Sequence, residues 1–171
     1  NLYVLVIVTD DKAYFSKAKS HPKDDWMFDS LQLYFDTFGD NAGRVAKQVF
    51  DYNDYCYTIG REQGSSKLRV FRSATPEQQI AGGLDAPQPN MIEPGVKARF
   101  IPLSKGYACE LVFPKKLIAP LMLQKNYFFR FGLLVNDNDG KGRKRGLSNT
   151  IGPNTEPYSH PEQWQGILLI K

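Results

Sequence analysis

Apolar and polar residues alternate along much of this chain, and a period of two predicts β-strands. In Ser30–Asp36, three apolar side chains face one way, while Gln32, Tyr34 and Asp36 face the other, which we take as the non-core face. Leu2–Val8 differs because it is apolar almost throughout, as expected of a strand that is covered on both faces.

The same alternation, interrupted by turn residues, predicts six further strands. They span residues 54–59, 67–71, 95–101, 107–113, 127–135 and 166–171. Residues 73–90 are rich in Pro and Gly and predict a surface loop, and residues 115–123 predict one short helical turn. Eight strands with little helix predict an all-β fold, a single antiparallel β-sandwich.

The length of 171 residues fits one domain spanning 1–171, which is large enough to bury its own core. No apolar run approaches the roughly 20 residues that a membrane helix needs, so no membrane partner is expected. The sequence starts directly in a strand at Asn1, without an initiator Met or a signal peptide. We therefore expect this domain to be excised from a longer protein, with other domains of the same polypeptide as its neighbours.

Charge and cysteine content exclude several classes of function. The 22 basic residues exceed the 18 acidic ones by 4, but they are scattered, so no nucleic acid partner is expected. The basic run at 141–145 predicts a solvated loop. Cys56 and Cys109 lack CxxC spacing, which excludes zinc and thioredoxin-type sites. Both lie in strand-like runs and are expected to be small buried side chains, with a single disulfide as the alternative.

No catalytic motif is visible in the sequence. His21 and His160 are each followed by Pro, which favours extended or turn backbone, and the HExxH, GxSxG and P-loop patterns are absent. A pair of carboxylates of the glycosidase kind remains an alternative, although nothing in the sequence positions two of them. The chain is therefore not expected to be an enzyme.

One loop is rich in oxygen ligands. Asn136-Asp137-Asn138-Asp139-Gly140 offers the carboxylate and carbonyl oxygens that calcium prefers, which makes Asp137 and Asp139 candidate metal ligands. The spacing is not that of an EF-hand. The same residue types also build plain turns, and this alternative stays open.

Trp26 is the main candidate for ligand binding. It lies among four polar or charged neighbours and follows Pro22, so partial exposure of its ring is expected. An exposed ring beside carboxylates suits a saccharide, because the ring covers the apolar sugar face while polar groups bind the hydroxyls. Trp164, in contrast, precedes an apolar run and is expected to pack at the base of the final strand.

These residues resemble the family 9 carbohydrate-binding modules over essentially the whole chain. The matching segments occur in the family's order: Asn1-Leu2-Tyr3-Val4, Val8-Thr9-Asp10, Trp26 followed by Asp29 through Asp36, Asp54-Tyr55-Cys56-Tyr57, Gly106-Tyr107 with Glu110-Leu111, Val135-Asn136-Asp137, and Pro161 with Trp164 and Gly166. Members of this family usually carry a further N-terminal segment, which implies that one or more N-terminal strands precede Asn1.

The resemblance implies non-catalytic saccharide binding by a module appended to a secreted glycoside hydrolase, and therefore an extracellular or cell-surface location. It aligns Trp26 with the family's stacking ring and Gln32 with the acidic residue that bonds hydroxyls, and it implies structural calcium in some members. Our leading hypothesis therefore places Trp26, Asp29, Gln32 and Tyr34 in or beside the site. Gln32 stands where the family has Glu, and an amide still bonds hydroxyls in both directions. The family's basic residue on the third strand is replaced by Thr58.

The family's second clamping Trp, expected near residues 147–149, is absent, and Tyr158 and Tyr34 are candidate replacements. Two other functions therefore stay open. One is a sandwich that has lost its sugar site and serves as a docking domain. The other is a haem-binding electron-transfer domain of the DOMON type, for which the available axial ligands are Met27, Met91, Met122, His21 and His160.

Overall fold

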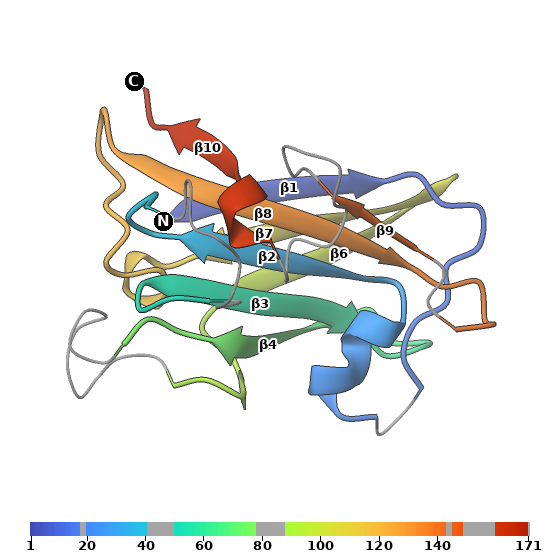
Figure 1. Cartoon of the computed structure of the whole chain (residues 1–171). Helices are drawn as coiled ribbons and strands as arrows, with labels where there is room; N and C mark the ends of the chain where they lie inside the picture. Colours follow the sequence, from blue (N-terminus) through green and yellow to red (C-terminus); the bar gives the residue numbers. More distant parts are fainter. Residues whose placement is uncertain (18–19, 41–49, 78–87, 143–144, 149–159, 171) are drawn as a thin grey trace.

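The computed structural model describes the chain except residues 18–19, 41–49, 78–87, 143–144, 149–159 and 171. The regular secondary structure of this part is almost entirely antiparallel β-sheet (Figure 1). The strands are β1 (Leu2–Val8), β2 (Ser30–Asp36), β3 (Asp54–Arg61), β4 (Leu68–Ala74), β5 (Met91–Ile92), β6 (Lys97–Leu103), β7 (Gly106–Phe113), β8 (Phe128–Asp137), β9 (Arg145–Ser148) and β10 (Gln165–Leu168). Short 3₁₀ turns are η1 (Pro22–Met27), η3 (Lys115–Leu117) and η5 (Pro161–Gln163).

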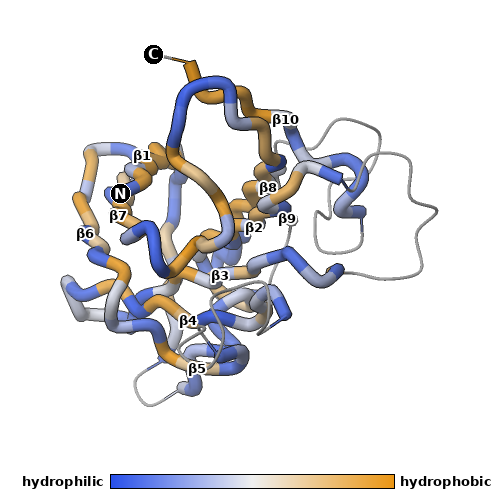
Figure 2. The backbone as a smooth tube through the Cα atoms, turned by 90° about the vertical axis from the view of Figure 1, so that its left-hand side faces the viewer, coloured by the Kyte–Doolittle hydropathy of each residue, from blue (hydrophilic) through white to orange (hydrophobic). Residues whose placement is uncertain are grey.

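The strands form two facing sheets, which confirms the predicted sandwich. The small sheet has the order β1-β7-β6, and the large sheet has the order β10-β8-β2-β3-β4-β5, with β9 paired to β8. Figure 2 shows the two layers from the side, with β1, β7 and β6 in one and β8, β2, β3 and β4 in the other. All the pairings between these strands are antiparallel. The structure describes no helix that is long and apolar enough to cross a membrane.

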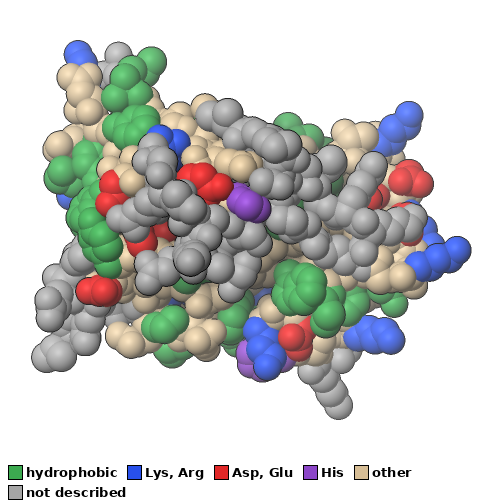
Figure 3. Space-filling model, viewed as in Figure 1, with side chains coloured by type: hydrophobic (Ala, Val, Ile, Leu, Met, Phe, Trp, Pro, Cys, Tyr) green, Lys and Arg blue, Asp and Glu red, His purple; other side chains and the backbone are tan. Residues whose placement is uncertain are grey.

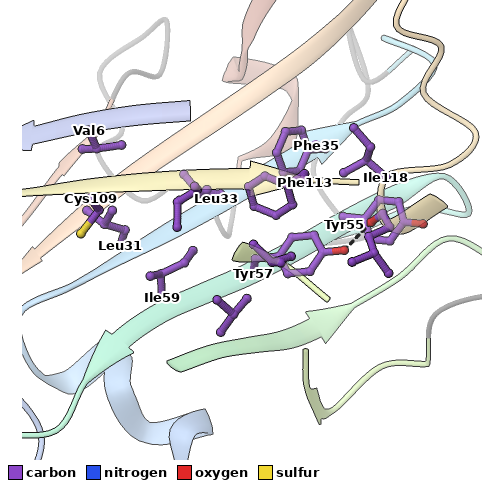
Figure 4. Close-up of a cluster of buried hydrophobic side chains, with 14 of the residues drawn as sticks. Val6, Leu31, Leu33, Phe35, Tyr55, Tyr57, Ile59, Cys109, Phe113 and Ile118 are labelled. Atoms are coloured by element: carbon purple, nitrogen blue, oxygen red, sulfur yellow. Dashed lines mark hydrogen bonds between the residues drawn. The ribbon is translucent and has the colours of Figure 1, made fainter. Parts of the chain in front are cut away.

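The main core lies between the sheets and is built around aromatic rings (Figure 4). Phe35 of β2 is fully buried, and its ring centroid lies 5.5 Å from that of Phe113 and 5.3 Å from that of Phe131. Tyr55 and Tyr57 are also buried, and their hydroxyls donate hydrogen bonds to the carbonyl groups of Ala119 and Leu117. The polar ends of these tyrosines are therefore satisfied inside the core.

The outer face of the large sheet holds a second, smaller core. Tyr34, Cys56, Leu134 and Trp164 are buried there together, and the centroids of Tyr34 and Trp164 lie 5.4 Å apart. The burial predicted for Trp164 is confirmed. The prediction that Tyr34 and Asp36 lie on a non-core face is wrong, because both side chains are completely buried. Alternation identifies the two faces of a strand, but a distant segment decides whether the second face is covered.

Strand β1 also departs from its prediction. Leu2, Val4 and Val8 pack against the main core, whereas Tyr3, Leu5 and Ile7 are 72%, 60% and 65% exposed. The apolar run predicted burial on both faces, and only one face is covered in the described part of the chain. A continuous apolar run therefore overstated the burial of this strand.

The two cysteines are free and buried, so the disulfide alternative is not supported. Cys56 belongs to the smaller cluster, and Cys109 belongs to the main core between the sheets. Burial raises the pKa of both thiols to about 12, which keeps them protonated and unreactive at neutral pH.

Replacing Phe35 with Ala tests the main core. The substitution removes the ring that meets Phe113 and Phe131, and we expect the free energy of unfolding to fall by about 3–5 kcal/mol in urea titrations. Leu5→Ala is the matched control, because its side chain is 60% exposed, and it should change stability by no more than about 0.5 kcal/mol. Equal effects of the two substitutions would contradict the described packing.

Candidate functional site

The short turn η1, which contains Trp26, lies beside the end of β3 (Figure 1). The turn begins at Pro22, where the preceding His21 ring accepts the N–H of Lys23 at 3.1 Å. It ends where the N–H of Phe28 donates to the Asp25 carbonyl at 3.0 Å. The Trp26 side chain is 42% exposed, which confirms the partial exposure expected from its polar neighbours.

Trp26 lines an open depression of about 460 Å³ at one end of the sandwich. Its wall is largely apolar, since Tyr14, Met27 and Phe28 lie beside Trp26, and the rings of Tyr14 and Phe28 are 6.0 Å apart. The remaining lining residues are Lys17, Asn138, Gly140 and Gly142. Figure 3 shows apolar side chains at the surface over η1, with basic and acidic side chains around them. We call this depression the Trp26 pocket.

Asp29 lies behind the walls of the Trp26 pocket and is not one of its lining residues. Its side chain is buried, and its two carboxylate oxygens accept the backbone N–H groups of Tyr14 and Asn138, the latter at 2.7 Å. Burial raises the pKa of Asp29 from 3.8 to about 6, and the two N–H donors offset only part of this effect. Both oxygens are thus already engaged within the protein.

The two other residues predicted to bind ligand lie elsewhere. Gln32 is half-buried on the outer face of the large sheet, paired in register with Thr58, and its amide oxygen accepts from Asn136 at 3.3 Å. Tyr34 is sealed between Trp164 and Phe50. Neither residue lines the Trp26 pocket. Tyr158 lies outside the described residues.

The pocket residues that sequence reasoning missed come from loops. Tyr14 and Lys17 follow β1, and Asn138 and Gly140 follow β8. Loops have no periodicity that would predict which of their residues meet. The one local signal is the Asx-type turn at Asn138, in which the side-chain oxygen of Asn138 accepts the N–H of Gly140 at 2.7 Å.

A separate acidic cluster contains the predicted metal ligands. Asp137 and Asp139 each place a carboxylate oxygen within 4.8 Å of the other and of Asp10, a residue that the sequence analysis did not select. The Lys12 ammonium donates to the Asp139 carbonyl at 2.8 Å and provides a nearby positive charge. These three carboxylates are the described residues best placed to hold a hard cation.

Apart from His21 and Met27, which lie at the two ends of η1, the candidate haem ligands lie on different segments. Met27, Met91 and Met122 are 39%, 50% and 43% exposed. His21 is engaged with its own turn, and the Nδ1 atom of His160 lies 3.0 Å from Glu162. No described contact brings two of these side chains together, so the haem alternative gains no support.

The Trp26 pocket therefore offers a ligand an exposed, ring-lined surface at one end of an antiparallel sandwich. Comparison with protein families matches residues 1–171 to the family described as Carbohydrate family 9 binding domain-like. The chain belongs to this family, and the resemblance inferred from its residues is confirmed.

Individual relatives agree with this assignment. Endo-1,4-beta-xylanase A of Thermotoga neapolitana is 26% identical over 171 residues, which is all of this chain and 13% of the xylanase. A family 9 carbohydrate-binding module from Caldicellulosiruptor kristjanssonii shares the fold. Its complex with cellotriose has a TM-score of 0.60 at 18% identity, covering 98% of this chain and 68% of that one. Its complex with glucose has a TM-score of 0.58 at 18% identity, and the match covers 97% of this chain and 69% of that one.

The raised pKa of Asp29 predicts a specific pH dependence of stability. Because its folded-state pKa of about 6 exceeds 3.8, the folded protein binds the proton more tightly than the unfolded chain does. The Asp29 contribution to the unfolding free energy should therefore fall as the pH rises from about 4 to about 6, by up to about 3 kcal/mol. Urea titrations in chelator-containing buffer measure this fall.

Asp29→Asn should remove that pH-dependent component, whereas Asp24→Asn should retain it, since Asp24 is a partly exposed carboxylate in the same segment. An unchanged pH profile in Asp29→Asn would contradict the assignment.

Proposed function

We propose that this domain binds a saccharide without cleaving it and that Trp26 is the ring on which the sugar stacks. The observation that carries the proposal is the exposed Trp26 ring in a depression whose other walls include Tyr14 and Met27. Aromatic walls suit the apolar face of a pyranose, and the exposed Lys17, which lines the same pocket, supplies donors for hydroxyls. The volume of about 460 Å³ lies within the usual range for small-molecule sites.

The first ligands to consider are β-linked gluco-oligosaccharides. Cellotriose and glucose occupy the related module from Caldicellulosiruptor kristjanssonii, although at 18% identity that likeness concerns the fold. The Trp26 pocket is open, which suits a segment of a chain better than an enclosed monosaccharide site would. Xylo-oligosaccharides are the natural comparison, because the relative from Thermotoga neapolitana is a xylanase.

The wider setting is also proposed from the relatives. The chain spans 13% of the xylanase that it resembles, which favours a role as one module among other domains of the same polypeptide. A module that holds a polysaccharide would keep an attached hydrolase close to its substrate, and this task belongs outside the cell or at its surface. Catalysis would then lie in the rest of the polypeptide and not in this domain.

Calcium is the proposed structural ion. Asp10 follows β1, and Asp137 and Asp139 lie at the end of β8 and just beyond it, so a cation held by these carboxylates would join the ends of strands from the two sheets. Three carboxylates suit a hard cation with oxygen ligands. Such an ion would also offset the mutual repulsion of the three negative charges.

Trp26→Ala is expected to weaken binding of cellotriose by at least about tenfold, because it removes the proposed stacking surface. Isothermal titration calorimetry measures the affinity, and intrinsic fluorescence gives a second signal in the native protein. Trp164 is fully buried, so a saturable shift is assigned to Trp26. Trp26→Phe is the matched control and should retain part of the affinity.

Unchanged affinity in Trp26→Ala would place the saccharide elsewhere. If the native protein binds no member of a panel of gluco- and xylo-oligosaccharides, the docking-domain alternative replaces the proposal.

Calcium should stabilise the domain through the acidic cluster. At a calcium concentration of about 100 times Kd, the expected gain in unfolding free energy is about 2.7 kcal/mol. Asp137→Asn should lose this gain, while Asp11→Asn, an exposed residue next to Asp10, should keep it. Urea titrations with calcium and with chelator make the comparison, and equal stability of the native protein in both would refute the site.

A further inference from the structure

We infer that Asp25 and Asp29, the two buried carboxylates on either side of Trp26, are positioning residues that fix the Trp26 pocket in its binding shape. The inference rests on the proposed function, in which Trp26 holds the saccharide. Neither carboxylate lines the pocket, and both side chains are buried, with exposures of 1% for Asp25 and 3% for Asp29. They act from behind the lining residues.

Asp25 fastens the turn η1 to the large sheet through Arg69 of β4. The Arg69 Nη2 atom lies 2.5 Å from Asp25 Oδ1, and Nε lies 3.3 Å from Oδ2, so the guanidinium contacts both carboxylate oxygens. Its other donors reach the Ser16 hydroxyl at 2.6 Å, the Ser20 carbonyl at 3.0 Å and Glu62 at 3.0 Å. Because each nitrogen of the planar Arg69 guanidinium donates a hydrogen bond, the group is held in one orientation. It therefore fixes the position of Asp25, the residue that precedes Trp26.

Gly60 of β3 provides the space in which Asp25 lies. A Cβ atom at position 60 would lie 2.1 Å from Asp25 Oδ2 and 2.5 Å from Asp25 Cβ, distances that no side chain tolerates. The turn η1 thus rests directly on the backbone of the large sheet. Any larger residue at position 60 would push Asp25, and Trp26 with it, away from the sheet.

Asp29 joins the two loops that form the other walls of the pocket. One carboxylate oxygen accepts the N–H of Tyr14 and the other accepts the N–H of Asn138, and both of these residues line the Trp26 pocket. The Asn138 amide in turn donates to the Met27 carbonyl at 2.6 Å. One buried side chain therefore holds three separate segments of the wall together.

The free-energy cost of burying the Asp25 and Asp29 carboxylates supports a role in binding for both of them. A buried carboxylate is weak evidence for stability, because its desolvation offsets most of the gain from its partners. The hydrogen bonds of Asp25 and Asp29 instead keep the wall of the Trp26 pocket ordered before the ligand binds. Binding to an ordered wall avoids the entropic cost of immobilising loops and side chains, and this saving appears as affinity.

Two substitutions test the inference without touching the pocket lining. Asp29→Asn keeps the shape, but its amide has one acceptor oxygen and so leaves one of the two N–H groups facing an NH₂ group. Gly60→Ala keeps Asp25 and Arg69 but removes the space for the carboxylate. Asp24→Asn is the matched control, with the same chemical change at the partly exposed neighbour of Asp25.

Two measurements are made on each variant. Calorimetric titration with cellotriose gives the affinity, which we expect to fall at least about tenfold in Asp29→Asn and Gly60→Ala and to stay unchanged in Asp24→Asn. Fluorine NMR of protein labelled with 5-fluorotryptophan gives two resonances, assigned with Trp26→Phe. The Trp26 line should shift or broaden in both test variants, while the line of the buried Trp164 stays in place and shows that the fold is kept.

The outcomes separate this inference from the proposed function. If Trp26→Ala loses binding while Asp29→Asn and Gly60→Ala bind as the control does, the positioning role is wrong and the stacking role stands. If Trp26→Ala binds normally, the proposed function is wrong, and an unchanged Trp26 fluorine line in both test variants also rejects the positioning role. Should Gly60→Ala fail to fold, Arg69→Lys replaces it, because it keeps the charge and loses the two-pronged contact with Asp25. Should Asp29→Asn fail to fold, Asp29→Glu replaces it, because it keeps the charge and displaces the carboxylate from the two N–H groups. Native affinity in the replacement variant overturns the positioning role of that carboxylate, and weakened affinity with an unchanged Trp164 line supports it.

Discussion

Strand β2 lies between β3 and β8 and is buried on both faces, and the rest of the molecule is organised around this double burial. On one face Phe35 joins the aromatic core between the sheets. On the other face Tyr34 packs beneath Trp164, which reaches the sheet from the last segment of the chain. Because neither face can shift without exposing apolar surface, the register of β2 is fixed, and so are the positions of the segments at its two ends.

The candidate site lies at one of these ends. Trp26 precedes the first residue of β2 by four positions, and the loops after β1 and β8 reach the same end of the sandwich. The rigid strands thus supply the positions, and the loops supply the chemistry, which is the usual division in proteins that bind ligands. Family membership fits this arrangement, since a carbohydrate-binding module needs a stable platform and exposed rings, without a catalytic centre.

Much of the fold follows from the sequence, because alternation and turn residues are local signals. Exposure of Trp26 and burial of Trp164 were both predicted from their neighbours and are confirmed. What could not be predicted depends on segments far apart in the chain. Tyr34 is buried because a distant Trp covers it, Tyr14 lines the pocket because a loop folds back, and Asp10 joins the acidic cluster because β1 and β8 end near each other.

The most direct test of saccharide binding at Trp26 is a titration of ¹⁵N-labelled protein with cellotriose, followed by the two indole N–H resonances and the backbone amides. The predicted result is a saturable shift of the Trp26 indole and of amides around the pocket, including Tyr14 and Gly140, while the buried Trp164 indole stays fixed. Saturable shifts confined to the outer face of the large sheet around Gln32 would contradict it. So would no shift at any ligand concentration.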